Sequence, residues 1–221
     1  MKKLLDRIFI DGLGGMAQGL FATLIIGTII QQIGLFMGGG TGDLIYELGK
    51  IAAGLTGAGI GVGVARKLEA GHLVIVSAAV VGMIGAFAGK ILSGQVLVDG
   101  NLVLAGPGEP LGAFAAAYLA IEIGILISGK TKLDIILTPL VCIGTGSAVG
   151  LFVGPPISEF MLWLGSLINW GTEQQPFLMG IVVSVLMGMI LTLPISSAAL
   201  GVILNLSGLA AGAATIGCCC N

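Results

Sequence analysis

Long apolar stretches alternate with short polar connections in this chain, which predicts a series of membrane-spanning helices. A helix needs roughly 20 apolar residues to cross the ~30 Å hydrocarbon core of a bilayer. The stretches that meet this measure are 13–37, 46–65, 73–93, 110–129, 135–154 and 176–194. A further stretch at 198–217 is weaker, so the sequence predicts about six to seven spans.

Continuous apolar runs favour helices over the strands of a membrane barrel. The run Thr23–Ile30 has no alternation of apolar and polar residues, whereas barrel strands alternate over about 10 positions. The first span follows Lys2, Lys3 and Arg7 and is much longer than the 7–15 apolar residues of a signal peptide. We therefore expect an all-α, polytopic transmembrane helix bundle with a retained first helix.

Composition agrees with this expectation. Of 221 residues, 56% are hydrophobic and 9% charged, against about 25% charged residues in an average soluble domain. So few charges cannot cover a water-soluble globule of this size, and the net charge of −2 offers no basic surface for phosphates. The lipid bilayer is the expected partner, and nucleic acid is not.

Basic residues gather on alternate connections. Cytoplasmic connections of membrane proteins carry an excess of Lys and Arg. The residues on one set of connections are Lys2, Lys3, Arg7, Arg66, Lys67, Lys130 and Lys132, and those on the other are Lys50 and Lys90. The sequence therefore predicts a cytoplasmic N-terminus.

Two of the external connections have patterns of their own. The segment Val96–Leu104 places two short apolar runs around Asp99-Gly100, which is a hairpin signal. Phe160–Trp170 is too short to span and holds both tryptophans, which favours a helix lying at the membrane interface. We expect Gly154-Pro155-Pro156 to end the fifth span.

Glycines within the spans recur four residues apart. The sets are Gly15/Gly19, Gly57/Gly61, Gly59/Gly63 and Gly146/Gly150/Gly154. Small residues at this spacing let helices approach closely in lipid. We expect tight helix packing and a homodimer formed through small-residue faces.

Two glutamates are the main candidates for chemistry. Glu122 lies within the fourth span, where a carboxylate must face protein or water because exposure to lipid is costly. It is either a substrate or proton site or a structural partner of a neighbouring group. Glu109 stands between Gly108 and Pro110, so its backbone either lines a cavity or forms an exposed external turn.

Neutral hydrogen-bonding groups complete the predicted solute site. The hypothesis has Glu109 and Glu122 accepting hydrogen bonds, with Thr138 and Asn205 adding neutral ones. No catalytic residues, metal site or cofactor are indicated, because the single histidine, His72, has no partner pattern and the terminal cysteines have no zinc spacing. The role of Cys218, Cys219 and Cys220 stays open.

Several stretches resemble one known family. These are Gly106–Phe114, Glu122–Gly124, Ser128–Pro139 and Val153–Ile157. They are similar to bacterial membrane proteins classed as EIIC-type permeases of the sugar phosphotransferase system, a family that includes a membrane protein named as a toxin regulator. The resemblance covers essentially the whole chain and implies a single permease domain over 1–221, here an N-terminal portion.

This resemblance implies transport of a sugar across the bacterial cytoplasmic membrane, with separate soluble components supplying the phosphate. In EIIC proteins a glutamate of a Gly-Ile-Thr-Glu-Pro segment contacts the sugar, and Gly108-Glu109-Pro110 shares the Gly/Glu/Pro core of that segment. The alternative hypothesis is a membrane regulator or sensor that binds a solute without net transport. The sequence leaves the substrate and the coupling ion open.

Overall fold

The structure is a computed structural model that describes residues 6–98, 101–104, 106–130, 132–191, 206 and 208–219. The chain divides into two compact units, Met1–Pro156 and Ile157–Asn221, which are described separately. Almost all the described residues are helical, so the prediction of an all-α fold is confirmed. That the whole chain is a single domain stays a prediction.

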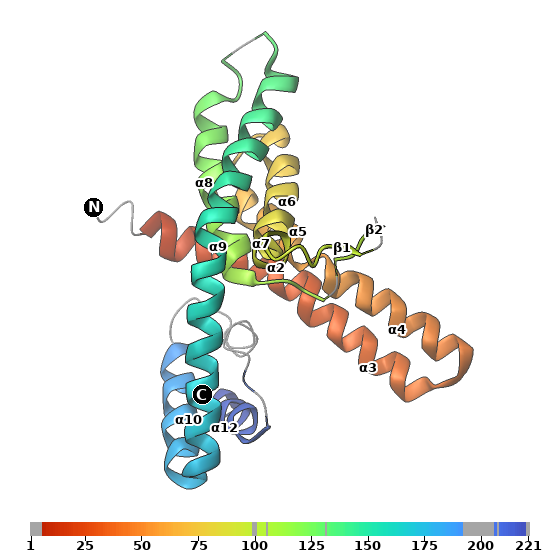
Figure 1. Ribbon diagram of the computed structural model, residues 1–221, viewed down its shortest axis with the longest axis vertical. Coiled ribbons are helices and arrows are strands. Elements are labelled where there is room, and N and C mark those ends of the chain that lie inside the picture. Colours follow the sequence, from red (N-terminus) through yellow and green to blue (C-terminus); the bar gives the residue numbers. More distant parts are fainter. Residues whose placement is uncertain are drawn as a thin grey trace. The chain divides into compact units, whose positions relative to one another are not determined.

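Unit 1 begins with one continuous helical stretch, after which the chain reverses direction. The stretch consists of η1 (Arg7–Gly12), α2 (Leu13–Leu20), η2 (Phe21–Ile25) and α3 (Ile26–Met37), where η marks π-helical turns. Gly38, with φ +61°, turns the chain directly into α4 (Gly39–Gly54), and α5 (Thr56–Lys67) follows. In Figure 1, α3 and α4 run side by side as a hairpin that projects from the rest of unit 1.

The return half of this hairpin differs from the prediction of one span over 46–65. The helix starts at Gly39, and Leu55 interrupts it so that α4 and α5 meet at 50°. Because glycine tolerates a positive φ, the chain reverses at Gly38 without a longer connection. The sequence pattern did not predict the break at Leu55, because the apolar run continues through it.

The rest of unit 1 consists of α6 (His72–Ala86), α7 (Ala88–Leu92), α8 (Pro110–Ile127) and the first part of α9 (Asp134–Gln174). Helix α5 contacts α2, α6 and α8, and Ile60, Val81 and Ile121 from three of these helices are fully buried. The core of unit 1 therefore lies among α5, α6 and α8.

Glycines bring these helices together, as the spacing predicts. A Cβ added at Gly15 would lie 2.6 Å from the carbonyl oxygen of Gly63, and one at Gly57 would lie equally close to that of Gly82. The contacts of Gly150 and Gly154 likewise lie within unit 1. The packing role of the glycines is confirmed. The glycine sets that motivated the homodimer prediction make their contacts with helices of the same chain.

Between α7 and α8 lies a short antiparallel hairpin. Strand β1 (Leu97–Val98) pairs with β2 (Asn101–Leu102), with Leu97 opposite Leu102 and Val98 opposite Asn101. Asp99 and Gly100 lie outside the described residues. The prediction of a hairpin in this connection is confirmed.

Helix α9 corrects the prediction that Pro155 and Pro156 end the fifth span. The helix contains Pro139, Pro155 and Pro156 and runs on to Gln174. A proline removes one backbone donor, but a membrane helix tolerates this when surrounding groups satisfy the freed carbonyl. The segment Phe160–Trp170 is helical, as expected, but it continues α9 and does not form a separate helix.

Unit 2 holds the end of α9 together with α10 (Pro176–Leu191) and α12 (Gly208–Cys219). Val183 of α10 packs against Ala213 and Ala214 of α12. The Ser184 hydroxyl donates to the carbonyl oxygen of Ala213 at 2.7 Å. Pro194 and the first part of the predicted seventh stretch lie outside the described residues, whereas α12 covers its second half.

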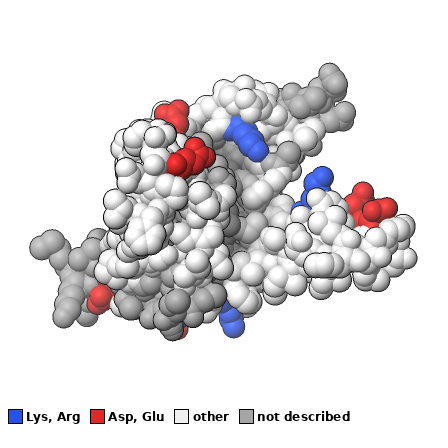
Figure 2. All heavy atoms as spheres, turned by 90° about the horizontal axis from the view of Figure 1, so that it is seen from below, with Lys and Arg blue, Asp and Glu red and all other residues white. Residues whose placement is uncertain are grey.

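Among the described residues, three helical stretches are long and apolar enough to cross a membrane. They are Arg7–Met37, Pro110–Ile127 and Asp134–Ile157, and the bent pair α4–α5 is a fourth if it counts as one span. Helix α6 and Pro176–Leu186 are apolar but shorter. The total of six to seven spans stays a prediction. The face seen in Figure 2 is mostly uncharged, with isolated charged side chains.

Candidate functional site

The break between α4 and α5 is built from Gly54, Leu55 and Thr56. The Leu55 N–H donates to the carbonyl oxygens of Ile51 and Ala52, both at 3.2 Å. The buried Thr56 hydroxyl donates to the carbonyl oxygen of Ala53 at 2.6 Å. The Ala53 carbonyl also accepts a backbone N–H at this helix end, so the polar groups of the break are satisfied within the chain.

A second break, at Phe87, separates α6 from α7. Phe87 has φ −109° and ψ 10°, and its N–H donates to the carbonyl oxygens of Met83 and Ile84. The Glu109 N–H donates to the carbonyl oxygen of Ala86 at 2.7 Å. A Cβ at Gly108, where φ is +72°, would lie 2.7 Å from Ala86 Cβ. Only glycine fits this close approach, so the segment before α8 is docked on the end of α6.

Glu109 is the N-cap residue of α8. Its backbone is extended, Pro110 takes the first helical position, and its carboxylate accepts the Leu111 N–H at 3.5 Å. Proline at this position and an acceptor at the cap both favour a helix start. The side chain is half-buried. Burial raises the pKa of the Glu109 carboxyl above its ordinary value, and the Leu111 N–H offsets part of that effect.

A cleft of about 500 Å³ lies at the α4–α5 break. Residues from α4, the break, α6 and the segment before α8 line it: Tyr46, Glu47, Lys50, Ile51, Gly54, Leu55, Met83, Leu104 and Gly106. Glu109 follows Gly106 closely in the chain but is not among the lining residues. The cleft thus joins the α4–α5 break to the segment that docks on α6.

Sequence analysis missed the polar residues of this cleft. The sequence pattern places Lys50 among the basic residues of the connections and assigns neither Glu47 nor Lys50 to the solute site. The available signal was a pair of opposite charges one helical turn apart, followed closely by Gly54 in an otherwise apolar run. Without the break at Leu55, that signal does not distinguish a cleft from a helix end.

Glu122 is part of an ion pair. Arg7 Nε donates to Glu122 Oε1 at 2.6 Å, and Arg7 Nη2 lies 3.4 Å from Oε2. The two side chains are 40% and 32% exposed. This geometry favours the interpretation of Glu122 as a structural partner, here of the first helix.

The predicted site residues are not all brought together. Helices α8 and α9 run antiparallel, since Gly150 approaches Ala116 and Gly124 approaches Cys142. Thr138 therefore lies near the end of α8 that is far from Glu109, and its buried hydroxyl donates a hydrogen bond to the Asp134 carboxylate.

The other predicted residues are also spread along the chain. Glu122 is roughly 20 Å from Glu109 along α8, at 1.5 Å per residue. Gly108 and Pro110 flank Glu109, and Asn205 lies outside the described residues.

Comparison with known proteins identifies the family of this chain. A family model described as "Phosphotransferase system, EIIC" matches residues 10–221. The chain belongs to the EIIC family of the phosphotransferase system. The resemblance seen in the sequence is confirmed, and the protein is a multi-pass membrane component of sugar transport. A comparison with curated proteins gives no significant match.

Proposed function

We propose that this EIIC protein carries a sugar across the bacterial cytoplasmic membrane at the junction of its interrupted helices. The observation that carries the proposal is the cleft at the α4–α5 break, which Gly106 also lines. Interrupted membrane helices commonly mark the solute site of a transporter, and non-helical backbone is tolerated where it lines a cavity. The junction is therefore suited to a solute of many hydroxyl groups.

Within this proposal Glu109 accepts hydroxyl groups of the sugar, with Gly108 and Pro110 fixing its backbone. A half-buried carboxylate beside a non-helical segment is suited to hydrogen-bond a solute that leaves water. Glu122 and Thr138 already bind Arg7 and Asp134. We therefore assign them a supporting role and keep Asn205 as a candidate contact.

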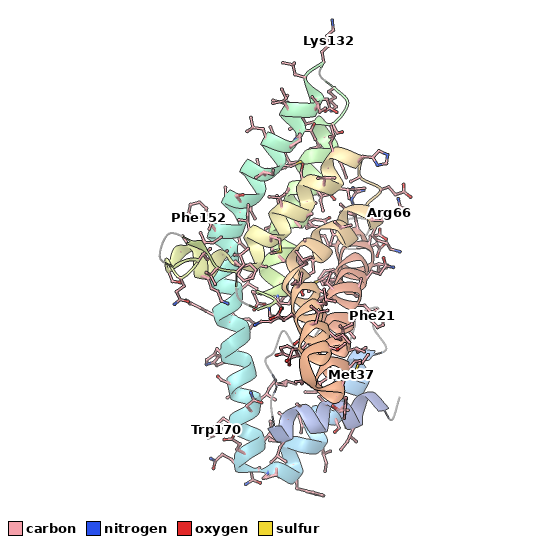
Figure 3. All side chains as sticks on the ribbon, turned by 90° about the vertical axis from the view of Figure 1, so that its right-hand side faces the viewer. Phe21, Met37, Arg66, Lys132, Phe152 and Trp170 are labelled. Carbon is pink, nitrogen blue, oxygen red and sulfur yellow. The ribbon has the colours of Figure 1, made fainter. Side chains whose placement is uncertain are left out.

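The orientation and the partners belong to the same proposal. We place the N-terminus in the cytoplasm, where soluble components of the phosphotransferase system phosphorylate the sugar, and we retain the homodimer as a prediction. In Figure 3, Arg66 and Lys132, from two connections expected in the cytoplasm, lie nearer the top than Met37 at the α3–α4 turn. This arrangement supports the alternation of sides on which the orientation rests.

Uptake and binding measurements test the proposal. Purified protein in vesicles, with soluble phosphotransferase components and phosphoenolpyruvate, should accumulate at least one of labelled glucose, galactose and mannitol. We expect Glu109→Gln to lower uptake by about tenfold or more, since a hydrogen bond to a charged group contributes about 1.5–3 kcal/mol. Glu122→Gln should keep most of it. Uptake that is unchanged in Glu109→Gln would contradict the role of Glu109.

The same preparation separates transport from sensing. Binding of a sugar by equilibrium dialysis without any accumulation would favour the alternative, a membrane sensor that binds without net transport. If the protein neither binds nor takes up any of the probes, both hypotheses are contradicted. A structural check by circular dichroism and size-exclusion chromatography shows that each variant is folded.

A further inference from the structure

We infer that Tyr46, Glu47 and Lys50 of α4 form a subsite that holds the sugar ring in the cleft at the α4–α5 break. The inference rests on the proposed function and adds the residues that select a neutral, hydroxyl-rich ring. No residue of this group belongs to the predicted site. All three line the cleft of about 500 Å³.

The packing of α4 fixes which side chains face the cleft. Gly42, Gly49 and Ala53 are buried, and the backbone of α3 lies against them, as shown by the close approach of Gly27 to Ala53 and of Gly34 to Gly42. Residues three and four apart share a helix face, so Tyr46, Lys50 and Gly54 follow one another along the cleft. Tyr46 lies at the edge of the face that meets α3, because a Cβ added at Gly34 would lie 2.6 Å from the Tyr46 backbone nitrogen. Lys50 and Gly54 lie further round the helix, away from α3.

These three side chains offer complementary contacts to a sugar. The Glu47 carboxylate accepts two hydroxyl groups, the Lys50 ammonium donates to ring or hydroxyl oxygens, and the Tyr46 ring covers an apolar C–H face. No ion pair joins Glu47 or Lys50 to another residue of the described part of the chain. The opposite charges cancel, so the cleft favours a neutral sugar over a phosphorylated one.

Space in the cleft is adequate for such a ligand. Small-molecule sites commonly enclose ~300–1,000 Å³. A Cβ added at Gly54 or Gly106 would meet no atom within 4 Å. Glycine at these two positions leaves the cleft open next to the charged pair, whereas the glycines between α2 and α5 meet backbone atoms.

Binding by variants tests the subsite directly. The probes are labelled glucose and galactose, measured by equilibrium dialysis on protein in lipid nanodiscs. We expect Glu47→Gln and Lys50→Gln each to weaken binding by about tenfold or more and Tyr46→Leu by about twofold to tenfold. The matched controls are Asp43→Asn, on the same helix, and Lys67→Gln, on α5; neither residue lines the cleft, and neither change should alter binding.

A steric variant tests the same cleft without changing a charge. Gly54→Leu should abolish sugar binding by filling the cleft, while Gly144→Leu should leave binding unchanged. Gly144, on α9, is equally free of neighbours within 4 Å and does not line the cleft. Thermal unfolding of both variants shows whether a loss of binding comes from misfolding.

The outcomes separate the subsite from the proposed function. Wild-type binding in Glu47→Gln, Lys50→Gln and Gly54→Leu would overturn the subsite, and sugar transport through Glu109 would stand. Tighter binding of glucose 6-phosphate than of glucose, lost in Lys50→Gln, would also overturn it, since the site would then recognise an anion. No sugar binding by the wild-type protein would contradict the proposed function itself.

Discussion

The glycines of unit 1 have opposite surroundings in two regions. Between α2, α5 and α6, glycines such as Gly57 and Gly61 lie against backbone carbonyls of the neighbouring helix, so no side chain fits. At the α4–α5 break, Gly54 and Gly106 meet nothing within 4 Å of an added Cβ. In the first region glycine brings backbones together, and in the second Gly54 leaves open space while Gly106 supplies a backbone with φ +84°. The contrast separates the close-packed core from the open cleft in which we propose that the sugar binds.

The largest expected effect comes from filling a closed glycine contact. Gly61→Leu places a side chain against the backbone of Ala78, and overpacking of this kind costs about 1–3 kcal/mol or more. We expect a clear fall in the midpoint of thermal unfolding in detergent. Gly54→Ala is the matched control, and an equal fall in that variant would remove the distinction between the two regions.

A smaller effect is expected from the ion pair that joins the first helix to α8. Arg7→Gln and Glu122→Gln should each lower stability by about 0.2–1 kcal/mol, the range of partly exposed pairs. The double variant should lose little more than either single variant, because both remove the same contact. Additive losses in a double-mutant cycle would show that the 2.6 Å contact between Arg7 and Glu122 does not couple the two residues.

The open glycine at the break should accept a side chain with a small gain. Gly54→Ala adds a methyl group where there is space and raises helix propensity near the end of α4. We expect the free energy of unfolding to rise by a few tenths of a kcal/mol, below the ~1 kcal/mol of a helix interior. Chemical denaturation in micelles measures it, and a loss of stability would show that the position is not open.

The smallest effect concerns pH. Burial raises the pKa of Glu109, so the folded protein binds more protons than the unfolded chain between the ordinary pKa and the raised one. Stability contributed by this group is therefore present at low pH and is lost as pH rises through the folded-state pKa. Glu109→Gln should flatten this part of the stability profile. An identical profile in the variant would contradict the burial of Glu109.

Much of the architecture follows directly from the sequence. Continuous apolar runs predicted helices, Asp99-Gly100 predicted the β1–β2 hairpin, and glycines four apart predicted close helix contacts. Each of these depends on neighbours in the chain or on the solvent in which the chain folds. Local residue types are sufficient for such features, and the family resemblance added the expectation of a sugar-transport component.

Other features needed the folded chain. The pairing of Arg7 with Glu122 joins residues far apart in the sequence. The break at Leu55 interrupts an apolar run, and α9 continues through Pro155, so neither helix boundary follows from hydropathy or from proline alone. For the same reason the predicted site did not include Tyr46, Glu47 or Lys50. Their common cleft exists because α3 packs on the neighbouring, glycine-lined face of α4, with Tyr46 at its edge, and because the segment before α8 brings Gly106 to the break. Hydropathy reports the preference of each segment for lipid, but only packing between helices determines where space for a polar ligand is left.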